Sequence, residues 1–150
     1  MSKVLVETII FSIPEAIVIV LLASSILGRK LKLTSLISIG IIFGIISPWI
    51  RLATGNYISN IILSSLVIIV LLKVFGQYDI FYTMTAVLMA ISLYLAIEFI
   101  NVKTIQILTG IDPIHMGQNL LLRTLWFLPQ IIVATGLVFV CRYFVSHQSS

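Results

Sequence analysis

The sequence predicts an all-α fold: a polytopic transmembrane helical bundle with about five spans and one short interfacial helix. The 150 residues are 60% hydrophobic and only 9% charged, whereas soluble domains carry about 45–50% apolar and about 25% charged residues. The apolar residues form five runs, most of them close to the roughly 20 residues needed to cross a bilayer. A soluble core of this size could not absorb so many apolar side chains. We therefore expect residues 1–150 to form a single integral membrane helical domain in the lipid bilayer.

The charge and the cysteine content exclude several classes of function. The formal net charge of +4 comes from nine Lys and Arg residues, which lie near the predicted helix ends as in membrane proteins, so no nucleic-acid partner is expected. The single cysteine, Cys141, excludes an intrachain disulfide and a cysteine-based zinc site. No Ser–His–Asp arrangement and no phosphate-cradling glycine loop is recognisable. We predict a protein that is not an enzyme and that has no cofactor or metal.

The first predicted span covers residues 4–27. Its start, Met1-Ser2-Lys3 before an apolar run, is superficially similar to a signal peptide, but Glu7 and Glu15 would lie inside the apolar region of such a peptide. An uncleaved first span is therefore expected. Pro14 removes one backbone hydrogen bond and should kink this helix near its middle.

The second and third predicted spans cover residues 36–52 and 57–75. The short turn Thr54-Gly55-Asn56 separates them. Gly40 and Gly44 are four residues apart, a small-xxx-small spacing that lets another helix approach closely. The second span should therefore pack tightly against a neighbour.

The fourth predicted span covers residues 80–100, and helical structure can continue to Leu108 before Gly110 ends it. Asp112-Pro113 is typical of a helix start, with Asp as N-cap and Pro at the first helical position. A short interfacial helix from about residue 113 to residue 121 is expected there.

The last predicted span covers residues 122–141, and Arg142-Tyr143-Phe144 closes it. The orientation follows from the loop that holds Arg29, Lys30 and Lys32, because a short, purely basic loop is retained in the cytoplasm. With five spans, the N-terminus lies outside the cell membrane and the C-terminus in the cytoplasm.

Four ionisable side chains interrupt the apolar helices: Glu7, Glu15, Arg51 and Glu98. An ionised group in hydrocarbon is costly, so such residues usually face the interior of a bundle and often mark a functional path. The predicted topology places three of them near the outer leaflet boundary, together with Arg123. Glu15 lies about 12 Å deeper than Glu7, at 1.5 Å per residue, and should be protonated or paired.

Two interpretations of these charges stay open. The acids and Arg51 can simply pair and fix the helix register, since buried ion pairs alone are weak evidence of a function. Alternatively, they line a polar vestibule, open to the outside, that receives a ligand or peptide. A proton-coupled role would need a second relay residue at the depth of Glu15, and the sequence offers none. The candidate ligand- or partner-binding residues are Glu7, Glu15, Arg51, Glu98 and Arg123.

Several short motifs together resemble the membrane-embedded N-terminal sensor region of Firmicutes histidine kinases of the accessory-gene-regulator type, which are peptide pheromone receptors, and stand-alone membrane proteins related to it. The resemblance covers almost the entire chain. The motifs are Ser12-Ile13-Pro14-Glu15-Ala16, Leu27-Gly28-Arg29-Lys30, Ile50-Arg51-Leu52, Leu108-Thr109-Gly110, Leu121-Leu122-Arg123 and Leu128-Pro129-Gln130.

The resemblance implies a function in signalling. In that family the membrane region receives a small extracellular signal, typically a peptide, and passes it to a cytoplasmic kinase. The present sequence departs from the pattern, because it holds no phosphoacceptor-histidine helix and no ATP-binding domain, and five spans are fewer than the usual six or seven. The resemblance therefore implies a relative that works through a partner, or one whose function has diverged.

Three functions are compatible with these patterns. The first is a receptor-like or accessory component of a signalling system, which binds an extracellular peptide, a small ligand or a membrane protein partner through the outer polar residues. The second is a small transporter or a membrane subunit of a multi-component transporter, which Glu15 and the Gly40/Gly44 packing would suit. The third is a scaffold for a membrane oligomer.

Overall fold

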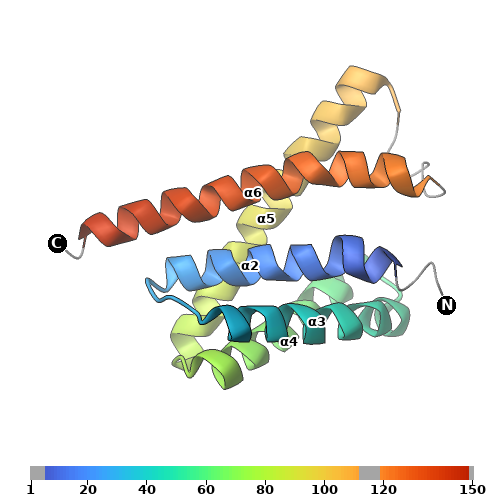
Figure 1. The fold of residues 1–150 in the computed structure, drawn as a ribbon. Coiled ribbons are helices and arrows are strands. Elements are labelled where there is room, and N and C mark those ends of the chain that lie inside the picture. The colour runs from blue at the N-terminus through green and yellow to red at the C-terminus, as the bar shows by residue number, and fades with distance from the viewer. Residues whose placement is uncertain (1–5, 112–118, 149–150) are drawn as a thin grey trace.

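The computed structural model describes residues 6–111 and 119–148, and this part of the chain is all-α, with no strand (Figure 1). Five of its helical segments are long and apolar enough to cross a membrane. The predicted transmembrane helical bundle is thus confirmed as a fold class, and its composition is that of a multi-pass membrane protein. The elements are η1 (Thr8–Ser12), α2 (Ile13–Ile26), α3 (Leu33–Thr54), α4 (Tyr57–Gly76), α5 (Ile80–Thr109) and α6 (Leu120–Gln148).

Helix α2 occupies the centre of the bundle. It packs against α3, α5 and α6, with α6 on one side, α3 and α4 on the other, and α5 crossing the group obliquely (Figure 1). Ala16, Val20, Leu22 and Ala23 of α2 have no exposed surface. Its small side chains, such as Ala16 and Ala23, let neighbouring helices approach closely, as small residues do at helix interfaces in membranes.

The outer helices keep an apolar face on the surface of the bundle. On α4, Ile62, Leu66 and Val70 follow one another at intervals of four residues, and each is more than half exposed. A continuous apolar stripe of this kind is a liability in water but is suited to contact with lipid tails.

The close approach predicted for Gly40 and Gly44 is confirmed, and the partner is the first span. A Cβ atom added to Gly40 would lie 2.6 Å from Cγ1 of Ile17, and one added to Gly44 would collide with the side chain of Ile13. The two glycines therefore form the surface of α3 on which the isoleucines of α2 rest.

The first span departs from a regular α-helix near Pro14, where a kink was predicted. The structure has a π-helical turn, η1, over Thr8–Ser12, and α2 begins directly after it. Proline lacks the N–H that would normally bond to the carbonyl of Ile10, so the backbone widens locally instead of continuing its i→i−4 ladder. The irregular turn lies next to Glu15.

Two helix ends differ from the predicted spans. Helix α5 continues past the predicted span to Thr109, in line with the prediction that helical structure can extend to Leu108. It is capped by Gly110, whose φ of 69° lies in the left-handed region. Helix α6 continues to Gln148, beyond the predicted membrane span of residues 122–141 and the Arg142-Tyr143-Phe144 segment predicted to close that span. The drop in hydropathy at Arg142 marks where the helix is expected to leave the membrane. Its backbone hydrogen bonds continue until a helix-breaking Gly or Pro occurs, and residues 142–148 contain neither.

The other predicted boundaries agree more closely. Helix α3 is longer than residues 36–52 by three residues at its start and two at its end. Most of the predicted interfacial helix, residues 113–121, lies outside the described residues. Its last two residues, Leu120 and Leu121, belong to α6.

Candidate functional site

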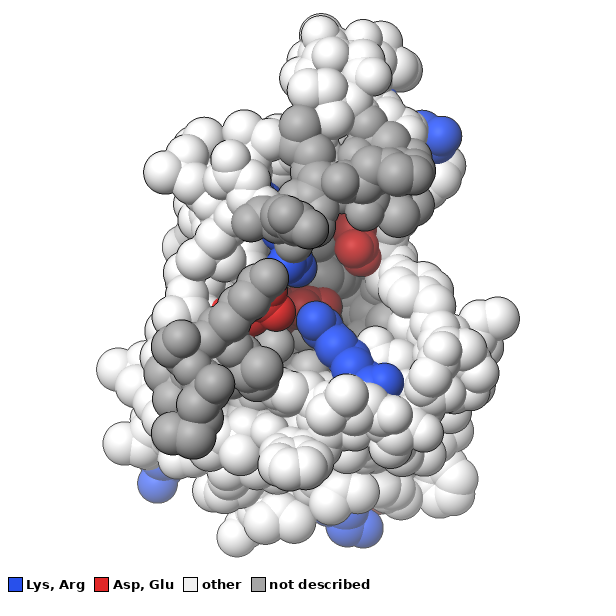
Figure 2. Space-filling model, turned by 90° about the vertical axis from the view of Figure 1, so that its right-hand side faces the viewer, with Lys and Arg blue, Asp and Glu red and all other residues white. Residues whose placement is uncertain are grey.

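A cavity of about 570 Å³ lies at the end of the bundle where α3 connects to α4 and where α6 begins. Residues from η1 and from α2 to α6 line it. Figure 2 looks onto this end of the molecule and shows acidic and basic side chains gathered in a hollow between the helices. We call it the charged cavity; its defining polar residues are Glu15, Arg51, Glu98, Arg123, Tyr94 and Gln130.

The deepest charge in the cavity is paired. Glu15 follows Pro14 in the first turn of α2, and Arg51, near the end of α3, reaches it with 3.9 Å between Nη2 and Oε2. The side chain of Arg51 is 52% exposed and that of Glu15 is 28% exposed. The expectation that Glu15 is protonated or paired is thus met by pairing, and the contact is long and open to the cavity.

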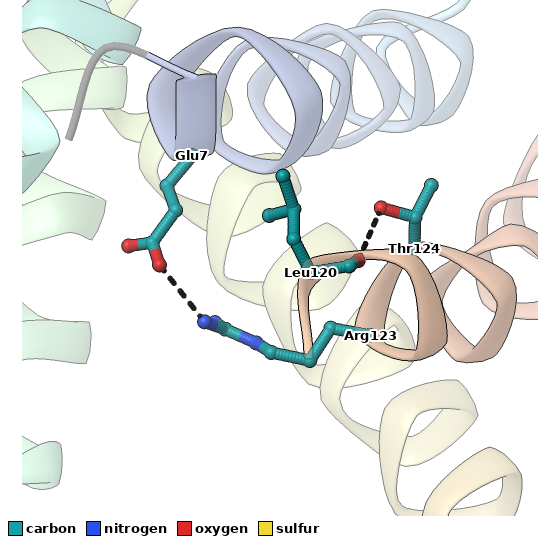
Figure 3. A network of polar contacts seen from close by, with 4 residues as sticks. All are labelled: Glu7, Leu120, Arg123 and Thr124. Atoms are coloured by element: carbon teal, nitrogen blue, oxygen red, sulfur yellow. Dashed lines mark hydrogen bonds and ion pairs between the residues drawn. The ribbon is translucent and has the colours of Figure 1, made fainter. Parts of the chain in front are cut away.

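A second pair joins the first span to α6. Nη1 of Arg123 donates a hydrogen bond of 3.0 Å to Oε1 of Glu7, as Figure 3 shows. The guanidinium of Arg123 also lies over the ring of Phe11, 5.1 Å from its centroid, and this ring meets Phe127 edge to face at 5.2 Å. Arg123 and both rings line the cavity, so Glu7 is tied to the cavity wall through Arg123.

Glu98 is the remaining acid of the site. It lies on α5, is half-buried and faces the same cavity. No ion pair of Glu98 with a described residue is present; Arg51 is the basic side chain that acts on it electrostatically, and Arg51 already contacts Glu15. The site thus combines three carboxylates with two guanidinium groups.

Several neutral polar residues of the cavity were not among the predicted site residues. Tyr94 is 1% exposed and Gln130 is 6% exposed, and the Tyr94 hydroxyl lies beside Gln130. Within the described part of the chain, neither this hydroxyl nor the buried Oδ1 of Asn60 has a hydrogen bond of good geometry. Only the spacing of Tyr94 and Glu98 in the sequence could have indicated that Tyr94 belongs to the site, because residues four apart lie on one face of a helix.

The five predicted residues therefore meet in one region of the structure. Four of them line the charged cavity, and Glu7 contacts one of these four. The topology predicted that Glu7, Arg51, Glu98 and Arg123 converge at one end of the bundle, whereas Glu15, expected deeper, lies within reach of Arg51; the role of these residues stays a prediction.

No protein-family model, no curated protein and no solved structure matches this sequence. The case for a function therefore rests on the cavity and on the short motifs of the sequence. Among the described residues, no three His, Cys, Asp or Glu side chains converge as a metal site would require.

The opposite end of the bundle has a smaller and different cavity. It measures about 310 Å³ and is lined by Arg29, Tyr78, Asp79 and Tyr82 among others. The guanidinium of Arg29 lies 5.8 Å from the centroid of the Tyr78 ring, and burial raises the pKa of Tyr78 while Arg29 opposes that shift. The basic loop is thus anchored at the end of the bundle away from the charged cavity.

Proposed function

We propose that the protein is a receptor-like or accessory membrane protein, without enzymatic activity, that binds a ligand in the charged cavity. The observation that carries this proposal is the open cavity of about 570 Å³ lined by Glu15, Arg51, Glu98 and Arg123. Sites for small ligands measure about 300–1,000 Å³ and combine apolar walls with a few polar groups. The charged cavity has this size and this composition.

The geometry of the Glu15–Arg51 pair favours ligand binding over a purely structural role. A solvent-exposed ion pair contributes little to stability unless its geometry is close to ideal. Here the two groups are 3.9 Å apart, and half of the Arg51 side chain is exposed in an open cavity. A ligand can therefore reach both charges without separating packed helices.

The orientation expected from the basic loop puts this cavity on the outer side of the cell membrane. Arg29, Lys30 and Lys32 lie between α2 and α3, at the other end of the bundle, and such loops stay in the cytoplasm. Together with the resemblance to peptide-receptor sensor regions, this supports an extracellular peptide or small ligand and a membrane protein partner that receives the signal.

A decisive test compares ligand retention by two charge-balanced double variants in lipid nanodiscs. Glu15→Gln with Arg51→Gln removes the pair in the cavity without leaving either charge alone, whereas Asp79→Asn with Lys73→Gln removes one acid and one base at the other end. The proteins are incubated with the peptide and small-molecule fraction of spent growth medium, and retained compounds are identified by mass spectrometry.

The wild type and the Asp79/Lys73 variant should retain the same compounds, and the Glu15/Arg51 variant should lose them. Circular dichroism and gel filtration establish that both variants remain folded. If the folded Glu15/Arg51 variant retains the same compounds as the wild type, or if the wild type retains none, ligand binding in this cavity is wrong.

One feature favours transport as the second candidate. The π-helical turn η1 precedes Glu15 in the first span. Helices α3 and α6, which also line the cavity, each contain a proline, Pro48 and Pro129, but stay continuous through it. An irregular helix next to a charged residue at membrane depth is a feature of transporter binding sites. Substrate flux into proteoliposomes that Glu15→Gln abolishes would support a small transporter or a transporter subunit; absence of any flux would exclude a self-sufficient one.

A further inference from the structure

The geometry points to a ligand that carries an ammonium group, which Glu98 binds inside the charged cavity. This inference rests on the proposed ligand-binding function and names the chemistry of the ligand. It follows from the charge balance of the site, from the surroundings of Glu98 and from the acceptor atoms that the cavity leaves unbonded.

The charge balance leaves one carboxylate over. Glu7 is bonded to Arg123 at 3.0 Å, and Glu15 contacts Arg51 at 3.9 Å. Glu98 has no partner at ion-pair distance among residues 6–111 and 119–148, although it is half-buried in the cavity wall. A partly desolvated carboxylate without a counter-ion is costly, and a ligand cation would remove this cost.

The surroundings of Glu98 suit an organic cation. Tyr94 precedes it by one helical turn and lines the same cavity. Tyr57, at the start of α4, also lines the cavity and is close enough to Glu98 to experience its charge. The ring of Tyr57 is 62% exposed and can attract an ammonium ion, whereas Tyr94, 1% exposed, forms the buried wall behind Glu98.

Two polar atoms in the wall of the cavity can accept a hydrogen bond. The buried Oδ1 of Asn60 and the hydroxyl of Tyr94 have no hydrogen bond of good geometry in the described part of the protein, and both residues line the cavity. An ammonium group has three donors and no acceptor. Glu98 is the charged acceptor of the cavity wall, and the Asn60 oxygen and the Tyr94 hydroxyl, which can also donate, lie buried in the same wall.

An anionic ligand would compete with acids of the chain for the two guanidinium groups of the cavity. The guanidinium of Arg123 is bonded to Glu7 and stacked on Phe11, and that of Arg51 contacts Glu15. A ligand carboxylate would therefore share each guanidinium with an acid of the chain, whereas an ammonium at Glu98 meets no competing cation at ion-pair distance among residues 6–111 and 119–148.

The ammonium can belong to a soluble amine, such as the N-terminus of a peptide, or to the headgroup of phosphatidylethanolamine. The test uses the full chain in nanodiscs of phosphatidylcholine and isothermal titration calorimetry. The cationic probe is the dipeptide amide alanyl-phenylalanine amide, which has a free ammonium and no carboxylate. Its N-acetylated form is the neutral control, and N-acetyl-alanyl-phenylalanine is the anionic control.

The cationic probe should bind, and acetylation should weaken its binding at least about tenfold, because a hydrogen-bonded charge pair is lost. Glu98→Gln should weaken it by a similar factor, and Tyr94→Phe, which removes one acceptor without changing charge, by a smaller factor. The matched control Asp79→Asn removes an acid outside the charged cavity and should bind the cationic probe like the wild type.

Nanodiscs that contain phosphatidylethanolamine distinguish the two sources. If the lipid headgroup is the ligand, it will compete with the cationic probe and weaken binding of the probe to the wild type. Binding of the probe to Glu98→Gln will then be the same in both lipids. If the soluble amine is the ligand, the probe will bind equally in both lipids. Either result supports an ammonium site.

Equal binding of the cationic and acetylated probes, or equal binding by folded Glu98→Gln and the wild type, would overturn the ammonium assignment. Binding of the anionic probe alone, lost in the Glu15/Arg51 double variant, would overturn it while the ligand-binding function stands. Failure of all three probes overturns the assignment, and the growth-medium experiment then decides the function separately.

Discussion

The guanidinium of Arg123 makes two contacts with the first span, the hydrogen bond to Glu7 and the stacking on Phe11. Arg123→Gln should lower the free energy of unfolding by about 1–2 kcal/mol, because a partly exposed ion pair and a cation–π contact each contribute at most about 1 kcal/mol. Arg123→Lys should lose about half as much, since an ammonium keeps the charge but lacks the planar face. Chemical unfolding in detergent micelles measures both values.

Lys103 provides the matched control for Arg123. Its contacts are to exposed Gln106 at 3.4 Å and to the Phe99 ring at 6.0 Å. Lys103→Gln should change the unfolding free energy by no more than about 0.5 kcal/mol. A loss as large as that of Arg123→Gln would mean that the Glu7–Arg123 pair contributes nothing specific.

The two partners of the deeper pair should respond unequally to substitution. Arg51→Gln leaves Glu15 without its counter-ion and should cost roughly 2 kcal/mol, while Glu15→Gln should cost less than about 1 kcal/mol, because Arg51 is half exposed and still has Glu98 nearby. The double variant should be more stable than Arg51→Gln alone. A double-mutant cycle of unfolding free energies measures this coupling, and equal costs for the two single variants would contradict it.

The sequence located the charges of the site but not their partners. Glu7, Arg51, Glu98 and Arg123 could be assigned to one end of the bundle by counting residues along each span. The Glu7–Arg123 pair joins residues 116 positions apart, and such a contact depends on how each helix is rotated about its axis. Apolar spans give little information on rotation, because lipid and protein interior accept the same side chains.

At the scale of whole helices, the length of the apolar runs predicted all five spans. The same signal does not mark the end of α6, since Arg142 leaves the apolar run but remains helical and donates a hydrogen bond of 3.2 Å to Ser25. The π-helical turn over Thr8–Ser12 was not predicted either. Pro14 indicates where the ladder is broken, whereas the form of the break depends on packing against α3 and α6.

The contact between α2 and α3 predicts a large effect of a single methyl group. Gly44→Ala should lower the free energy of unfolding by about 1–3 kcal/mol, because the new Cβ would collide with Ile13 near its β-branch and force the two helices apart. Thermal unfolding of the purified protein, followed by circular dichroism, measures the loss.

Gly136→Ala on α6 is the control for this substitution. A Cβ at that position meets nothing within 4 Å, so the change should be neutral or should stabilise the helix by up to about 1 kcal/mol. If both alanine variants were equally stable, the glycines of α3 would not be required for helix packing.

For the molecule as a whole, charge is distributed unequally between the two ends of the bundle. Among the described residues, one end holds the charged cavity, lined by Glu15, Glu98, Arg51 and Arg123, and Glu7 bonded to Arg123 beside it. The other end holds the basic loop of Arg29, Lys30 and Lys32, with Arg142 of α6 bonded to Ser25 nearby. Because basic loops are retained in the cytoplasm, this asymmetry predicts that the cavity faces the outer side of the membrane.

Cysteine labelling of intact cells tests that direction. Cys141→Ala removes the native thiol, and single cysteines then replace Lys30, in the basic loop, and Ile111, just after α5; both native residues are exposed. A membrane-impermeant maleimide should label Ile111→Cys in intact cells and Lys30→Cys only after permeabilisation. The reverse pattern would place the charged cavity on the cytoplasmic side. In that case the ammonium ligand would have to come from inside the cell, and an extracellular signal would be excluded although the chemistry of the cavity is the same.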